Sequence, residues 1–204
     1  MEQNSLYKQN SLYKQYSLYI FDMGGVVTTS AFIEKQMSET LHVSVDDFHA
    51  FSDELLAQLS DGAISTKEFW NSFSQRSGIA VKTDWWHWLF HPVRNEQTCD
   101  IVRRLKASGK RVVCGTNTID SHYRNHCERG DYELFDQTYA SFLMGVSKPD
   151  VAFWNIILAA EKVKPEDAVF IDDKKENCEA AASLGIHAIQ FTTAEALATA
   201  LEMQ

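Results

Sequence analysis

Side chains suited to phosphate or metal chemistry come directly after four short apolar segments of the chain. These side chains are Asp22, Thr116 with Asn117, Lys148, and Asp172 with Asp173. One carboxylate of such a set can act as a nucleophile, and others can bind Mg²⁺, which prefers oxygen ligands. A hydroxyl, a backbone amide and a lysine can hold phosphate oxygens. Phosphoryl transfer depends mainly on positioning and charge neutralisation, and this set of groups can supply both.

The apolar segments themselves have the length and composition of buried strands. The predicted strands are 18–21, 111–115, 137–142, 168–171 and 186–191. Helical patterns separate the later strands, and such alternation is typical of a parallel sheet with helices on both faces. We therefore expect an α/β fold, a doubly wound, five-stranded, Rossmann-like sheet. Because ligands bind such sheets at the carboxyl ends of the strands, the polar groups are expected to lie together.

Residues 30–98 have a different pattern, without convincing buried strands. They are predicted to form helices separated by loops at Asp61-Gly62 and Ser77-Gly78. We expect a core domain of residues 18–29 and 99–204, with residues 30–98 inserted as a helical cap domain. Residues 1–17 contain a repeated hexapeptide, Asn-Ser-Leu-Tyr-Lys-Gln, and are predicted to be a disordered extension.

Composition limits the classes of partner. The 204 residues include 19 Lys and Arg against 28 Asp and Glu, a net charge of −9, and no basic patch typical of a nucleic-acid binder. The sequence contains no run of 18 apolar residues, so no membrane span is predicted. The 4 cysteines form no CxxC pair and are expected to be reduced thiols in the cytoplasm. The expected partner is therefore a small molecule rather than a nucleic acid or a membrane.

Four motifs, in order along the chain, resemble those of the haloacid dehalogenase-like hydrolase superfamily with a helical cap after the first motif. The motifs are Phe21-Asp22-Met23-Gly24-Gly25-Val26-Val27, Gly115-Thr116-Asn117, Ser147-Lys148-Pro149-Asp150 and Phe170-Ile171-Asp172-Asp173. Within that superfamily the sequence is similar to sugar phosphatases and to the phosphatase domain of soluble epoxide hydrolases. The resemblance implies a Mg²⁺-dependent phosphomonoester hydrolase that acts on a small phosphorylated metabolite such as a sugar phosphate.

The resemblance also implies a role for each polar residue. Asp22 would be the nucleophile that forms an aspartyl-phosphate, and Lys148 would neutralise the charges of this nucleophile and of the phosphate. Thr116 and Asn117 would hold the transferring phosphoryl group. The expected Mg²⁺ ligands are Asp22, Asp173 and the backbone carbonyl of Gly24, supported by Asp172 and Asn177.

Gly24 departs from the pattern of the family, in which most phosphatases have an aspartate two residues after the nucleophile as general acid and base. We favour a phosphatase in which water or another group, for example His122 or His126, supplies the proton. A catalytically weak or inactive binding protein with this fold is the first alternative. A 2-haloacid dehalogenase is the second, although dehalogenases typically have an aromatic residue at this position and need no Mg²⁺. Glycine is also compatible with a positive φ at residue 24.

Overall fold

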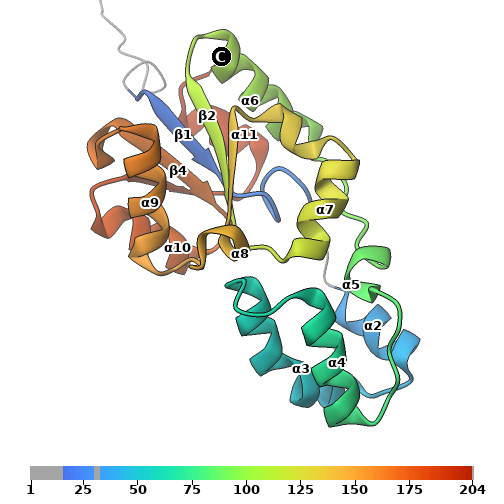
Figure 1. The fold of residues 1–204 in the computed structure, drawn as a ribbon. Helices are drawn as coiled ribbons and strands as arrows, with labels where there is room; N and C mark the ends of the chain where they lie inside the picture. Colours follow the sequence, from blue (N-terminus) through green and yellow to red (C-terminus); the bar gives the residue numbers. More distant parts are fainter. Residues whose placement is uncertain (1–15, 30–32, 204) are drawn as a thin grey trace, which may run out of the picture.

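The computed structural model describes residues 16–29 and 33–203, which form a sheet-containing lobe and a helical lobe (Figure 1). Most of the repeat lies in residues 1–15, outside the described residues. The sheet has five parallel strands in the order β3-β2-β1-β4-β5. The strands are β1 (Leu18–Phe21), β2 (Arg111–Thr116), β3 (Gln137–Ala140), β4 (Ala168–Asp172) and β5 (His187–Gln190). The predicted doubly wound α/β fold is confirmed.

Strand β3 ends two residues before the predicted segment 137–142 does, because a helical turn, α8 (Ser141–Met144), begins at Ser141. The Ser141 hydroxyl is fully buried, accepts a hydrogen bond from Thr118 N and donates one to the carbonyl of Ser60. Ser141, which makes these contacts, belongs to α8 and not to the sheet. Sequence pattern alone did not distinguish the turn from the strand.

The alternation of side chains along the strands divides the core into two layers. Leu18 and Ile20 pack with the helices α9 (Val151–Glu161) and α10 (Lys175–Ser183) on one face. Tyr19 and Phe21 pack on the other face with the helices α6 (Glu96–Ala107) and α11 (Ala194–Ala200). All four residues of β1 are completely buried, as expected for the central strand of a covered parallel sheet.

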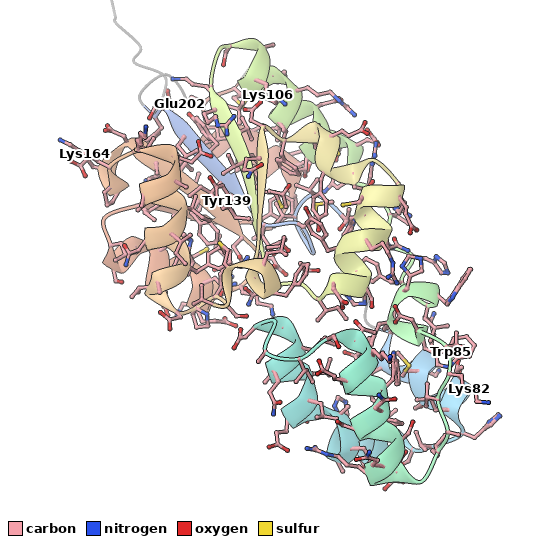
Figure 2. The ribbon with its side chains drawn as sticks, viewed as in Figure 1. Lys82, Trp85, Lys106, Tyr139, Lys164 and Glu202 are labelled. Carbon is pink, nitrogen blue, oxygen red and sulfur yellow. The ribbon has the colours of Figure 1, made fainter. Side chains whose placement is uncertain are left out.

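The helical lobe consists of α2 (Glu34–Leu41), α3 (Val45–Ser60), α4 (Thr66–Ser77) and the short α5 (Trp85–Trp88). Their apolar faces form a separate cluster rich in aromatic rings, which include Phe48, Phe69, Phe73 and Trp86. Figure 2 shows Lys82 and Trp85 in this lobe, at the opposite end of the molecule from Lys106 and Lys164 of the sheet lobe. The prediction of helices with loops at Asp61-Gly62 and Ser77-Gly78 agrees with these bounds.

Several contacts connect the two lobes. Two linkers join the lobes: one follows β1, and the other leads from α5 to α6. They pair through an antiparallel bridge between Thr28 and Arg94. The loop between α3 and α4 lies against α8 so closely that a Cβ on Gly62 would meet the carbonyl oxygen of Phe142 at 2.0 Å. The helix α7 (Asp120–Glu128), which follows β2, packs against α5 and completes the connection.

Among residues 16–29 and 33–203, no helix is long and apolar enough to cross a lipid bilayer.

Candidate active site

The central strands bring the two acidic segments to the same edge of the sheet. Phe21 of β1 pairs with Ile171 of β4, and the N–H of Asp22 donates to the carbonyl of Ile171 over 2.8 Å. Because both strands end here, Asp22 and Asp172 emerge side by side at the carboxyl edge. The buried apolar runs that precede the two aspartates fix this alignment, and 8% of Asp22 and 0% of Asp172 remain exposed.

Lys148 connects these carboxylates. Its ammonium donates to Asp22 Oδ1 over 2.8 Å, to Asp172 Oδ2 over 2.7 Å and to the carbonyl of Gly115 over 3.0 Å. Three acceptors match the three donors of an ammonium group, so the buried charge is completely coordinated. Burial alone would lower the pKa of Lys148, but Asp22 and Asp172 outweigh it and raise the pKa. The lysine is therefore charged.

Asp172 is the anchor of this arrangement. The amide nitrogen of Asn177 lies 3.0 Å from each of the two Asp172 carboxylate oxygens, and the backbone N–H of Lys174 donates to Oδ1 over 2.8 Å. The sulfur of Cys178 lies 3.5 Å from the Asp172 carbonyl. With Lys148 on its remaining side, the Asp172 side chain is held from several directions, and it also stabilises the turn that begins α10.

Asp173 completes an acidic cluster. One ligand oxygen from each of Asp22, Asp172 and Asp173 lies within 4.8 Å of the others. Oδ1 of Asp173 is buried and has no hydrogen-bond partner among the described residues. A buried carboxylate oxygen without a partner is costly, and an oxygen-preferring cation would satisfy it. These residues therefore fit a divalent cation, and the acidic group is compatible with metal binding.

The pKa values of the cluster are consistent with this excess of negative charge. Burial raises the pKa of the Asp22 carboxyl to about 6, against the opposing effect of Lys148. The pKa of Asp173 is also raised, by burial and then by the neighbouring Asp172 charge. One ammonium does not compensate three carboxylates, and a bound cation would favour the ionised form of each.

Thr116 and Asn117 lie at the end of β2, beside β1, as predicted. The Asn117 side chain donates to the carbonyl of Lys148 and accepts from its N–H, both over 2.8 Å. Asn117 therefore positions the segment that contains Lys148, and its amide group is occupied by this task. The Thr116 side chain is buried, and its hydroxyl lies 3.4 Å from the Asn117 carbonyl.

Gly24 lies in the turn after Asp22, and its backbone does not have a positive φ. A Cβ at residue 24 would meet no heavy atom within 4 Å. The positive φ with which glycine at residue 24 is compatible is therefore not adopted. The residue that does adopt it is Gly25, whose φ is 84° and whose Cβ would lie 2.5 Å from Oδ2 of Asp173.

His122 and His126 do not join the carboxylate cluster. The ring of His122 stacks on Phe90 with a centroid distance of 3.8 Å, and His126 Nδ1 lies 2.8 Å from Oδ2 of the buried Asp131. Burial lowers the pKa of His122 to about 3 and also lowers the pKa of His126. Both rings are packed into the junction between α7 and its neighbours, and neither makes a hydrogen bond or ion pair with Asp22, Asp172 or Asp173.

Two glycines contribute to the site without a side chain, and residue chemistry alone does not reveal them. The carbonyl of Gly115 binds Lys148, and a Cβ on this residue would lie 2.9 Å from Ile20 Cγ2. Gly25 makes room for the carboxylate of Asp173. The one available signal was the glycine at the end of an apolar strand, which often marks a close approach of other groups.

Comparison with known proteins agrees with the order of the motifs. Residues 16–185 match the haloacid dehalogenase-like hydrolase family. The chain belongs to this family. The matched region includes all the predicted site residues, the helical lobe and four of the five strands, so the expected resemblance and the expected class, a hydrolase, are confirmed.

Individual relatives resemble this haloacid dehalogenase-like hydrolase over most of its length. The sesquiterpene phosphatase astK of Aspergillus oryzae is 28% identical over 196 residues, 91% of this chain and 93% of the relative. A predicted HAD-like hydrolase from Porphyromonas gingivalis has a TM-score of 0.78 at 22% identity, covering 93% of this chain and 99% of the other. A HAD family enzyme from Bacteroides thetaiotaomicron, crystallised with magnesium and inorganic phosphate, has a TM-score of 0.72 at 23% identity, covering 87% and 94%. Because these two solved structures are only 22% and 23% identical to this chain, their similarity shows a shared fold and nothing more.

Proposed function

We propose that this hydrolase is a Mg²⁺-dependent phosphatase that cleaves small phosphomonoesters through an aspartyl-phosphate on Asp22. The observation that carries the proposal is the buried Lys148 ammonium, 2.8 Å from Asp22 and 2.7 Å from Asp172, next to the unsatisfied carboxylate of Asp173. This arrangement places a nucleophile, a fixed positive charge and a cation site at one edge of the sheet. The phosphatase relative supports the same reaction class.

In the first step, a carboxylate oxygen of Asp22 attacks phosphorus, the bond between phosphorus and the substrate oxygen breaks, and the leaving oxygen takes a proton from solvent to form the alcohol. Lys148 holds Asp22 in place and balances its charge and that of the phosphate, while the Thr116 hydroxyl and the backbone around Asn117 bind phosphate oxygens. Mg²⁺, held by Asp22, Asp173 and the Gly24 carbonyl, would neutralise charge on the phosphoryl group. In the second step, water attacks phosphorus, which releases inorganic phosphate, regenerates the Asp22 carboxylate and leaves one proton to solvent.

Gly24 supplies no proton to the leaving oxygen, and missing general acid catalysis costs a factor of about 10²–10⁴. We therefore expect substrates with acidic leaving groups, such as anomeric sugar phosphates. The helical lobe acts as the cap that selects among them. The named activity of the relative adds sesquiterpenyl phosphates as the contrasting candidates, because their alcohol leaving group is not acidic.

A substrate panel tests this proposal. Purified protein is assayed with sugar 1-phosphates, sugar 6-phosphates, nucleotides and farnesyl phosphate, with Mg²⁺ and with EDTA. We expect phosphate release that requires Mg²⁺ and is reduced by several orders of magnitude in Asp22→Asn. A folded Asp22→Asn protein that keeps more than a few per cent of the activity would refute the nucleophile assignment.

The same panel separates the alternatives. Halide release from 2-haloacids in EDTA would favour the dehalogenase. A protein that shows neither activity would favour the binding protein. The acidic cluster around Asp173 supports a metal-dependent enzyme over a dehalogenase, because Asp173 Oδ1 has no other partner among the described residues.

A further inference from the structure

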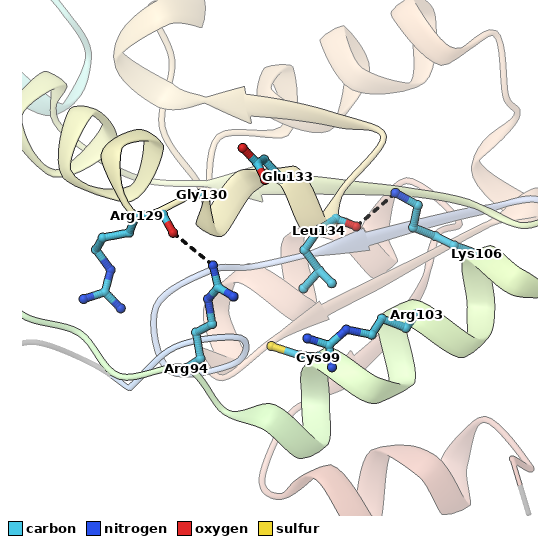
Figure 3. A pocket seen from close by; sticks show the side chains of 8 residues that line it. All are labelled: Arg94, Cys99, Arg103, Lys106, Arg129, Gly130, Glu133 and Leu134. Atoms are coloured by element: carbon cyan, nitrogen blue, oxygen red, sulfur yellow. Dashed lines mark hydrogen bonds between the residues drawn. The ribbon is translucent and has the colours of Figure 1, made fainter.

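A cavity lies in the sheet lobe, outside the carboxylate cluster. It has a volume of about 470 Å³ and lies between α6, the turn after α7 and the linker that returns from the helical lobe (Figure 3). The charged residues that line it are Arg94, Arg103, Lys106, Arg129 and Glu133. Four cations therefore face one acid, in a protein whose net charge is −9. The volume is that of a small-molecule site.

Two of these cations are held together by one buried carboxylate. Arg94 Nε donates to Asp131 Oδ1 over 2.6 Å, and Arg129 Nε donates to Asp131 Oδ2 over 2.9 Å. Asp131 is 2% exposed and also contacts His126, whose pKa is lowered by burial, so this ring adds no charge at neutral pH. The two guanidinium groups and Asp131 thus carry a net charge of +1.

Both guanidinium groups have N–H donors that bind no acceptor among the described residues. Arg94 uses one terminal nitrogen to donate to the carbonyl of Arg129 over 3.2 Å, and its other terminal nitrogen has no protein acceptor among residues 16–29 and 33–203. Within the same part of the chain, the Arg129 guanidinium group bonds only through Nε, and both of its terminal nitrogens have no protein acceptor. Their side chains are 37% and 36% exposed, so a ligand can reach them.

The other two cations are compensated by acids. Arg103 pairs with Glu96 and Asp100, and Lys106 pairs with Asp136 at 3.1 Å. Arg103 and Lys106 extend the lining of the cavity, but the positive charge that no acid compensates lies on the pair of Arg94 and Arg129. Glu133, which has no ion pair among the described residues, is the acid that opposes an anion in this cavity.

We propose that this cavity is a second binding site, specific for a small phosphate-bearing anion that is held by Arg94 and Arg129. Arginine recognises phosphate through paired N–H donors, and two guanidinium groups fixed by a common carboxylate are preorganised for it. The site is independent of the proposed catalytic function, because it shares no residue with the carboxylate cluster. Since Arg94 bridges Thr28 of the other linker, the bound anion also stabilises the junction of the two linkers.

Isothermal titration with inorganic phosphate in EDTA tests the proposal with three variants. Arg129→Gln should weaken binding at this site about tenfold, as expected for loss of a charged hydrogen bond. Glu133→Gln removes the opposing charge and breaks no ion pair, so it should strengthen binding. Arg76→Gln is the matched control, because Arg76 is 37% exposed and pairs with Glu54 at 2.8 Å in the helical lobe.

Binding at the catalytic cluster would be the same in all three variants, so equal affinities throughout would overturn the proposal, as would no binding at millimolar phosphate. Thermal unfolding of each variant identifies any loss of folding in Arg129→Gln. Glu133→Gln then provides an answer that does not depend on the ion pair with Asp131.

Discussion

The charge of the buried Lys148 side chain depends on the groups that surround it. Its ammonium is buried, yet it stays charged because two carboxylates and the Gly115 carbonyl accept all of its donors. Removing one partner of such a set leaves a buried charge uncompensated, which is strongly destabilising. Asp172 therefore has a structural role through Lys148, whereas Asp22 keeps an oxygen available for reaction.

A substitution at Gly24 is expected to change which phosphate esters the protein hydrolyses fastest. The variant Gly24→Asp should increase turnover of alkyl phosphates about 10²-fold and change aryl phosphates little, since general acid catalysis matters most for poor leaving groups. The open space around residue 24 and its ordinary φ make the substitution compatible with the fold. Steady-state kinetics on a matched alkyl and aryl pair measures the effect. An unchanged ratio in a folded variant would mean that another group already donates the proton.

His122 should make the protein sensitive to acid. Its pKa is lowered from 6.5 to about 3 by burial, so between these values the unfolded state binds a proton that the folded state does not. Its contribution to stability is therefore complete above pH 6.5 and declines as pH falls towards 3. In His122→Phe, the loss of unfolding free energy from pH 7 to pH 5 should be smaller by about 2 kcal/mol.

Urea unfolding of wild type and His122→Phe at several pH values measures this difference. His49→Gln serves as the control, because His49 is partly exposed, pairs with Asp53 and has a raised pKa, which gives a pH dependence of stability with the opposite sign. Parallel pH profiles for wild type and His122→Phe would contradict the prediction.

At the scale of elements, the loop between α3 and α4 determines how the helical lobe contacts the sheet. Gly62 lies against the backbone of Phe142, and in the same loop Asp61 accepts a hydrogen bond from Ser147, the residue before Lys148. The loop thus touches the segment that carries Lys148, the lysine of the proposed mechanism. A displacement of this loop is expected to affect catalysis as well as stability.

The variant Gly62→Ala should therefore lower both kcat/KM and stability, because its methyl group would collide with the Phe142 carbonyl. Gly78→Ala is the matched control, since Gly78 also has a positive φ of 74° but its Cβ would meet nothing within 4 Å. The control should lose about 1–2 kcal/mol from the left-handed conformation alone, with kcat/KM unchanged. Equal effects of the two variants in kinetics and thermal unfolding would exclude a functional role for the contact.

At the scale of the whole molecule, cation binding should stabilise the fold. The acidic cluster joins β1 and β4, and its repulsion is relieved when a cation binds. At a Mg²⁺ concentration 100 times the Kd, the gain is about 2.7 kcal/mol, equivalent to a rise in melting temperature of roughly 5–10 °C for a chain of this size. Thermal unfolding with Mg²⁺ and with EDTA should show this rise in wild type and a much smaller one in Asp173→Ala. The same rise in both proteins would place the metal elsewhere.

The amino-acid sequence predicts the sheet, the helical segment inserted after the first strand and the polar residues at the strand ends, because these follow from apolar periodicity and from residue types. It did not determine the end of β3, where the buried hydroxyl of Ser141 makes its contacts after the strand. It also did not show that Asn117 holds the Lys148 backbone, or that Gly25 rather than Gly24 has the restricted conformation. These features depend on contacts between segments distant along the chain. Only the tertiary structure decides such contacts, because distance along a chain does not limit distance in space.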